Sequence, residues 1–335
     1  MNTESIFLAV KQSPEVARLS QTYVKIFMPA LPGIIWPQVI TGIVVNILNA
    51  LINYIFLFVL DLGIVGSAAA STISQYCLAV FLFAYILCKG LHRPTWGGWS
   101  MECLQEWGSF IRLAIPSMFM ICLEWWIYEI GAVLAGLISE VELGAQSIIY
   151  VLGSVAYKIP LGFSIAASVR VGNALGAGNI QQAHLSSKVS IIYTAVICIG
   201  VAVIIGALKD VISFVFTNDE QIRRRVGEVM VVYAPLHFLE AIVCVTGGIL
   251  RGVAKQKICA LSNLVCYYFV GTPIGVSLMF PAKLGITGLW TGIFICVFLL
   301  AGFCLTIIQK LDWKKAAKEV RPPSSICTIL HTDCL

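Results

Sequence analysis

Long uncharged stretches recur along this chain and set its pattern of apolar and polar residues. Three of them, 189–208, 259–280 and 286–309, contain no charged residue. A hydrocarbon layer about 30 Å thick is crossed by about 20 apolar residues in a helix. The strands of a membrane barrel are instead about ten residues long and alternate in polarity. The pattern therefore predicts eight membrane-spanning helices, near 38–60, 66–88, 112–137, 143–168, 189–208, 229–250, 259–280 and 286–309.

Composition removes the soluble alternatives. Hydrophobic residues make up 59% of the 335 residues and charged residues only 12%, whereas about a quarter of a soluble domain is charged. The net charge of +5 comes from Lys and Arg in the gaps between apolar stretches, so it is no patch for nucleic acid. We exclude a soluble enzyme, a secreted disulfide scaffold and a nucleic-acid-binding protein, and expect a polytopic all-α protein in the lipid bilayer.

The twelve cysteines do not change this interpretation. Six of them fall inside apolar stretches, where Cys behaves as a small hydrophobic residue; no CxxC occurs, and no Cys/His spacing suits zinc. We therefore predict neither a metal nor a cofactor. The first 20 residues contain Glu4 and no small-residue cleavage site after a long apolar stretch, so a cleavable signal peptide is not expected.

Basic residues in alternate gaps predict the orientation. One set of gaps, which includes the tail after 309, holds twelve Lys and Arg, and the opposite set holds five. Because cytoplasmic loops carry the excess of basic residues, we expect the C-terminus inside. The exception is 209–228, which contains the triplet Arg223, Arg224 and Arg225.

Prolines break the region before the first span. Three prolines and Gly33 lie between 29 and 37 and prevent a regular helix, so 24–36 is expected to be interfacial or re-entrant. The predicted organisation is a cytoplasmic or interfacial segment at 1–37, two spans at 38–90, a cytoplasmic linker at 91–111, six spans at 112–309 and a cytoplasmic tail at 310–335.

Three acids fall within predicted spans: Glu124, Glu129 and Glu240. An acid at mid-membrane is unfavourable by several kcal/mol unless it faces water or a partner, which indicates a proton or cation site. The alternative is an acid that simply hydrogen-bonds a neighbouring helix. Glu129 lies about 140° around the helix from Glu124, so both face one narrow pore only if the helix unwinds.

Aromatic residues accompany these acids. Tyr233, His237 and Glu240 are spaced i, i+4 and i+7, so they share one helix face. Rings near a carboxylate offer faces to an organic cation, although they are often core or interface residues. A site that holds either a proton or a cation is the chemical minimum for an antiporter. The aromatic and imidazole candidates for its cavity are Trp125, Tyr128, Tyr150, Tyr233 and His237.

The run SVRVGNALGAGNIQQA at 168–183 is rich in glycine. GxGxxG is absent and no strand precedes the run, so a phosphate-binding loop is a weak interpretation. A helix end and a tight turn, with Arg170 at the lipid headgroups, is favoured.

Taken together, the chain resembles the animal branch of the multidrug and toxin extrusion (MATE) family. The resemblance covers most of 95–313 and extends to 14–32 through PEVARLSQTYVKIFMPALP. The stretches that carry it are TWGGWSMECLQEWGSFIRLAIPSM, LEWWIYEIG, VELGAQSIIY, GFSIAASVRVGNALGAGN, FLEAIVCVTGGILRG and GTPIG.

The resemblance implies a transporter, not an enzyme, that exchanges organic cations for protons at the plasma membrane. The family fold has two six-helix lobes around a central cavity. The spans at 112–309 would form the complete C-terminal lobe, and 38–90 would supply about two helices of an N-terminally shortened first lobe. Family carboxylates that are thought to bind protons and cations map onto Glu124, Glu129 and Glu240.

Two positions depart from the family pattern. Val151 stands where animal members usually carry a glutamate, and Lys158 lies seven residues on, on the same helix face. We hypothesise weaker attraction for cations, with Lys158 paired to Glu124 or Glu129.

Other functions stay open. The shortened chain could associate with full-length relatives or form an oligomer without transporting anything itself. A membrane enzyme or flippase lacks a catalytic or metal motif in the sequence, and a receptor is disfavoured by eight spans with mid-membrane acids.

Overall fold

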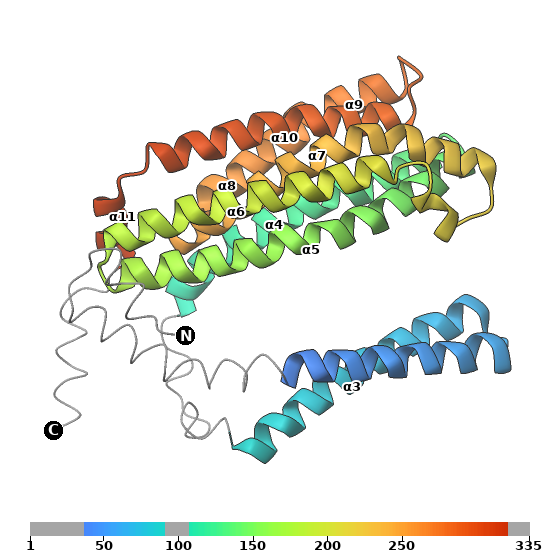
Figure 1. Cartoon of the computed structure of the whole chain (residues 1–335), viewed down its shortest axis with the longest axis horizontal. Helices are drawn as coiled ribbons and strands as arrows, with labels where there is room; N and C mark the ends of the chain where they lie inside the picture. Colours follow the sequence, from blue (N-terminus) through green and yellow to red (C-terminus); the bar gives the residue numbers. More distant parts are fainter. Residues whose placement is uncertain (1–36, 91–106, 321–335) are drawn as a thin grey trace. The chain divides into compact units, whose positions relative to one another are not determined.

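A computed structural model describes residues 37–90 and 107–320 of the chain (Figure 1). It contains eight helices that are long and apolar enough to cross a membrane, as the sequence predicts. The chain divides into two compact units, Met1–Gln105 and Glu106–Leu335. The predicted interfacial segment at 24–36 lies outside the described residues.

The first unit contains a pair of helices joined by a tight turn. The span Pro37–Val59 ends in the π-helical turn η1 (Ile55–Val59), and α3 (Gly63–Lys89) follows. Asp61 and Gly63 have positive φ values of 49° and 54°, which reverse the chain between the helices. The Asn49 amide donates a hydrogen bond of 3.1 Å to Ser74 Oγ on α3, so the two helices are also joined within their length.

The second unit is a bundle of six spans (Figure 1). One span is divided by local geometry into α8, a π-helical stretch η4 and α9. The elements are α4 (Trp107–Gly136), α5 (Glu140–Gly176), α6 (Ile180–Ala207), the 3₁₀ turn η3 (Ile212–Val215), α7 (Glu220–Gly252), α8 (Gln256–Asn263), η4 (Leu264–Gly271), α9 (Thr272–Met279), α10 (Ile286–Gln309) and α11 (Trp313–Val320).

α7 is the central helix of this bundle. It packs against α5, α6 and α10, and most of its apolar, membrane-spanning part is buried. Glycines allow α5 to approach it closely, because a Cβ on Gly248 would lie 2.3 Å from the Ser164 carbonyl oxygen and one on Gly252 would lie 2.6 Å from that of Ser168. Ser164 Oγ also donates to the Cys244 carbonyl at 2.6 Å. Small residues and interhelical hydrogen bonds hold helices together in lipid, where hydrophobic association is weak.

Several helices are longer than the uncharged stretches that predict them. α5 continues to Gly176 and α6 begins at Ile180, after a turn that contains Gly178 at φ +77°. The helix end and turn predicted for 168–183 are therefore confirmed, but α6 begins nine residues earlier than expected. Asn179 caps α6 by accepting the Gln182 N–H at 3.0 Å. Apolar residues mark only the part of a helix that crosses the hydrocarbon layer.

The same effect shifts two other boundaries. α7 begins at Glu220, where the Asp219 carboxylate caps it, and not near 229. α4 begins at Trp107, so the last five residues of the predicted linker 91–111 are helical; residues 91–106 lie outside the description. Pro116 lies inside α4.

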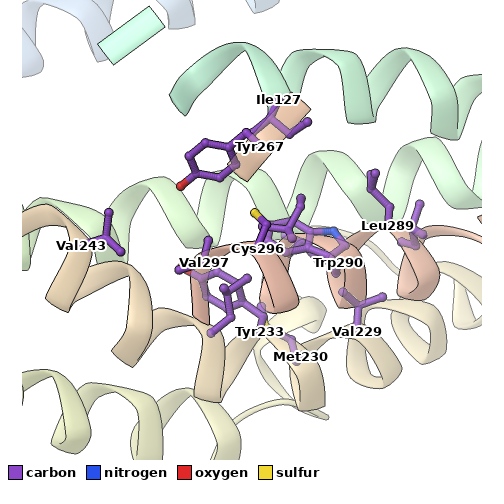
Figure 2. Packing of buried hydrophobic residues seen from close by; sticks show 14 of the residues in the cluster. Ile127, Val229, Met230, Tyr233, Val243, Tyr267, Leu289, Trp290, Cys296 and Val297 are labelled. Atoms are coloured by element: carbon purple, nitrogen blue, oxygen red, sulfur yellow. The ribbon is translucent and has the colours of Figure 1, made fainter. Parts of the chain in front are cut away.

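The core of the second unit is built around aromatic side chains. Figure 2 shows Ile127, Tyr233, Tyr267 and Trp290 packed among apolar neighbours, with the Cys296 thiol in the same cluster. Trp290 is 1% exposed, and its indole Nε1 donates to Gln146 Oε1 at 2.8 Å. All cysteines in the described part of the chain are free thiols, and five of them are buried. Their packing agrees with the prediction that they act as small apolar residues.

An ionic cluster holds the end of the bundle where α7 begins. Arg225 Nε lies 2.6 Å from Glu142 Oε1 on α5, and Arg225 Nη1 lies 2.6 Å from Glu228 Oε2. Arg225 Nη2 also donates to the Leu284 carbonyl in the loop before α10. Glu142 Oε2 accepts the Ile286 N–H at 2.7 Å. One guanidinium therefore connects α5, α7 and the α9–α10 loop.

The opposite end of the bundle carries α11, which lies inside the predicted tail. Asp312 Oδ1 accepts the backbone N–H groups of Lys314 and Lys315 at 3.0 and 3.1 Å. These bonds begin the helix and lower the pKa of the Asp312 carboxyl, with Lys315 as the main cause. Ala316 and Ala317 are buried, while both lysines are exposed. α11 is thus a surface helix with one packed face.

Candidate functional site

A cavity lies inside the second unit. Two carboxylates, Glu124 on α4 and Glu240 on α7, line it, and Gly153 and Ser154 of α5 form part of its wall. The remaining lining consists of six aromatic side chains: Trp125, Tyr128, Tyr150, Tyr157, Tyr233 and Trp290.

Each of the two acids accepts a hydrogen bond from a tyrosine on another helix. Tyr157 Oη on α5 donates to Glu124 Oε1 at 2.7 Å, and Tyr128 Oη on α4 donates to Glu240 Oε1. Phenol donors stabilise an ionised carboxylate, because hydrogen bonds to charged groups are stronger than neutral ones. Each carboxylate keeps a second oxygen, for which the described residues show no hydrogen bond. That oxygen is available to a proton or to a cationic ligand.

The rings form a connected wall around the acids. The centroids of Trp125 and Tyr157 are 5.8 Å apart in an edge-on arrangement, those of Tyr128 and Trp290 are 5.8 Å apart, and those of Tyr233 and Trp290 are 5.4 Å apart. Figure 2 shows the last two residues together in the core. Aromatic faces attract organic cations and exclude bulk water. The wall therefore suits an apolar cation better than a hydrated inorganic one.

Helical spacing explains why these residues meet. Tyr150 and Tyr157 lie seven residues apart on α5, and Tyr233 and Glu240 lie seven apart on α7. Two turns of helix return a side chain to nearly the same face, so each pair faces the cavity together. The i+7 relation to Tyr150 is the signal in the sequence by which Tyr157 could have been found. Trp290 has no such signal, because it is one aromatic residue in an uncharged span.

The structure places His237 away from the lining of this cavity. The spacing placed His237 beside Tyr233 and Glu240 on a cavity-facing stripe, and both of those residues do line the cavity. His237 itself is fully buried, and it is not among the residues that line the cavity. Neither ring nitrogen has a hydrogen-bond partner among the described residues. Its angular offset around α7 directs the ring into the packing between helices.

Glu129 lies at the edge of the site. Its residue is exposed, and it does not line the cavity. Tyr150, which does line it, has its hydroxyl 3.4 Å from Glu129 Oε1. This separation from Glu124 follows from the 140° offset between the two positions, since α4 is a regular helix here.

The two departures from the family pattern lie on the exposed side of α5. Val151 is 43% exposed, and Lys158 is exposed as well. The hypothesis that Lys158 pairs with Glu124 or Glu129 is wrong for the described residues, among which it forms no ion pair. Its ammonium instead lies 5.9 Å from the centroid of the Trp125 ring.

A second cavity adjoins the first. The two share Glu124, Trp125 and Tyr157, and the second also reaches Arg251 and the Cys244 thiol. The predicted span 229–250 ends before Arg251, but α7 continues to Gly252, so Arg251 lies on this helix and lines the second cavity. Among residues 37–90 and 107–320, no group of three or more His, Cys, Asp or Glu side chains is arranged to hold a metal ion.

Comparisons with known proteins find related sequences and structures. The family model MatE matches residues 116–277. Multidrug and toxin extrusion protein 1 of Danio rerio is 60% identical over 334 residues, which cover 95% of this chain and 57% of that protein. The Homo sapiens protein of the same name is 51% identical, over 96% of this chain and 59% of its own length. The chain therefore spans a little under three fifths of these relatives.

Solved structures show the same fold. The crystal structure of the eukaryotic MATE transporter AtDTX14 matches with a TM-score of 0.79 at 27% identity, over 95% of this chain and 75% of that one. The Vibrio cholerae MATE transporter VcmN in its bent form matches with a TM-score of 0.66 at 15% identity, over 84% and 63% of the two chains. The all-α fold, with six spans in the second unit and two in the first, is that of these transporters.

Proposed function

Since this chain belongs to the MATE family of multi-pass membrane transporters, we propose that it exchanges organic cations for protons through the cavity of its second unit. The observation that carries the proposal is the pair of carboxylates, the half-buried Glu124 and the buried Glu240, inside an aromatic wall. The names of the relatives support extrusion of drugs and toxins as its activity.

Coupling follows from competition for the same oxygens. An ionised Glu240 attracts a cation, and the rings of Tyr128, Tyr233 and Trp290 shield the charge from water. A proton that binds the carboxylate removes this attraction, so cation and proton exclude one another. In a protein that opens to either side of the membrane, protons moving down their own gradient would then drive the cation in the opposite direction, because the protonated and unprotonated sites differ in cation affinity.

Glu129 is proposed as an outer acid of the same site. It lies at the edge, connected through Tyr150 to the cavity wall. An exposed carboxylate there raises the local concentration of cations, which affects capture more than exchange. Glu124 would share the inner site with Glu240, because both line the cavity.

We also propose that the protein resides in the plasma membrane with its C-terminus in the cytoplasm. The asymmetry of twelve against five basic residues in alternate gaps supports this orientation. A tag after Leu335 should be inaccessible to antibody in intact cells and accessible after permeabilisation. Staining of intact cells would contradict the orientation.

The second candidate is association with longer relatives without transport by this chain. The observation that favours it is coverage of only 57–59% of those relatives. Co-purification of differently tagged forms would test association, and uptake by the purified chain alone would contradict the absence of transport.

The test of the main proposal is uptake of a fluorescent organic cation into proteoliposomes under an imposed pH gradient. Wild type should accumulate the cation and lose it when the gradient collapses, whereas Glu240→Gln should not accumulate it. Glu140→Gln is the matched control, because Glu140 is exposed at the start of α5, far along the helix from the cavity residues. Equal uptake by Glu240→Gln and Glu140→Gln would refute the role of the cavity.

A further inference from the structure

A groove lies at the α11 end of the second unit, outside the two cavities described above. The first turn of α8 and the last two turns of α10 form it. Ile258, Phe303 and Ile307 provide an apolar wall, and Lys255 and Lys310 stand at its polar end. Ile258 and Phe303 are 37% and 47% exposed. The groove is therefore lined by apolar side chains and by two lysines.

The surroundings of the groove are strongly basic. Lys257, Lys314 and Lys315 are all exposed on the segments next to it. Asp312 is the acid that lines the groove, and its Oδ1 accepts two backbone N–H groups of α11. These bonds turn the carboxylate toward α11, so its repulsion of an anion in the groove is reduced.

The backbone adds to the positive potential. α8 begins after Lys255, which provides no side-chain cap to its first turn. An uncapped helix N-terminus directs N–H groups and the positive end of the helix dipole outward. Here it lies beside the two lysines that line the groove, so the same location gathers three sources of positive potential.

We propose that this groove binds an anionic phospholipid, with the headgroup phosphate at Lys255 and Lys310 and an acyl chain along Phe303 and Ile307. The combination of basic and apolar side chains favours this occupant. A soluble phosphate would not contact the apolar wall, and a neutral lipid would not neutralise the lysines. Basic pockets between transmembrane helices are a recognised form of anionic-lipid site. This binding is independent of transport, so it stands or falls separately from the proposed function.

The expected effect can be stated as a ratio of affinities. One basic side chain near an anionic membrane surface contributes about fivefold to binding. The double variant Lys255→Gln/Lys310→Gln should therefore bind an anionic lipid about 25-fold more weakly than wild type. Lys310→Gln alone, which changes an exposed side chain, should lose about fivefold.

The test is titration of the purified full chain in detergent with dioleoyl phosphatidylserine or dioleoyl phosphatidylcholine, with bound lipid counted by native mass spectrometry. Wild type should retain phosphatidylserine in preference to phosphatidylcholine. The two lysine variants should lose that preference, and the double variant should lose more of it than Lys310→Gln. Lys283→Gln is the matched control, because Lys283 lies in the loop at the other end of the bundle. It should keep the wild-type preference. Phe303→Ser should weaken lipid binding as well, since it removes the apolar wall.

Three results would overturn the proposal. Equal retention of the two lipids by wild type would remove the charge selectivity, and equal loss in Lys283→Gln would show that the effect is not local. Competition by soluble glycerophosphoserine at the concentration of the lipid would mean that the groove binds free phosphates and not lipid. If the double variant does not yield a monodisperse protein, Lys310→Gln decides the outcome alone.

Discussion

Replacing Arg225 should reduce the stability of the second unit more than any neighbouring charge. The guanidinium bonds Glu142, Glu228 and the Leu284 carbonyl at once, and Glu142 also accepts the Ile286 N–H. The side chains of Arg225 and Glu142 are only 20% and 12% exposed. Arg225→Gln therefore leaves a mostly buried carboxylate without its counterion.

The magnitude follows from this burial. Removing one partner of a buried ion pair costs about 3–5 kcal/mol, and the remaining exposure places this pair near the lower end, at about 3 kcal/mol. For a unit of this size, 1 kcal/mol corresponds to a change in Tm of about 2–4 °C. We expect Arg225→Gln to lower Tm by about 6–12 °C. Arg224→Gln is the matched control, because Arg224 is 83% exposed and lies 3.5 Å from Glu228; it should cost about 0–1 kcal/mol.

The assay is thermal unfolding of the detergent-solubilised protein, followed by the monodisperse fraction on size-exclusion chromatography and by tryptophan emission. Glu142→Gln and the double variant with Arg225→Gln complete a thermodynamic cycle. The double variant should lose about 1–3 kcal/mol less stability than the two single variants lose together, since each single variant already breaks the pair. Equal Tm shifts for Arg225→Gln and Arg224→Gln, or strictly additive effects in the cycle, would show that this ion pair does not stabilise the bundle.

Three other predictions concern packing and the cavity. Gly248→Ala should destabilise the protein by about 1–3 kcal/mol in the same thermal assay, because the added Cβ meets an α5 carbonyl. Gly247→Ala, which has open space at its Cβ, should not, and equal effects would contradict the close approach of the two helices. Tyr157→Phe should weaken cation binding to the purified protein by about tenfold, because it removes the charge-assisted hydrogen bond to Glu124. Unchanged affinity would show that this hydroxyl does not organise the site. Lys158→Met should increase cation uptake by about two- to fivefold, because it removes a positive charge beside the Trp125 ring. Unchanged uptake would mean that this lysine does not affect the cavity.

The sequence predicts the spans well because lipid imposes one simple rule on them. Stretches such as 286–309 must be apolar over the hydrocarbon thickness, and α10 occupies that range. The ends of α6 and α7 are missed because polar residues at 180–188 and 220–228 continue the helices outside that layer. Their caps, Asn179 and Asp219, are visible in the sequence, and a search for them would have corrected both boundaries.

Helical spacing alone predicts the cavity only in part. Tyr233 and Glu240 line it as their i+7 relation suggests, but His237 does not, because a difference of a few tens of degrees around α7 separates the cavity from the packed interface. Trp290 and Arg251 require knowledge of which helices are neighbours. That knowledge comes from packing between helices and not from the period of one helix.

The proposed exchange requires a proton and a cation to compete at Glu240. The most direct measurement is the Kd of an organic cation for the purified protein at a series of pH values from about pH 5 to about pH 9, for wild type and for Glu240→Gln. Protonation opposes cation binding, so the wild-type Kd should rise as pH falls, with a slope that approaches about tenfold per pH unit for one competing proton. The slope should be reduced or lost in Glu240→Gln. A wild-type Kd that does not change with pH, or an unchanged slope in Glu240→Gln, would contradict the claim.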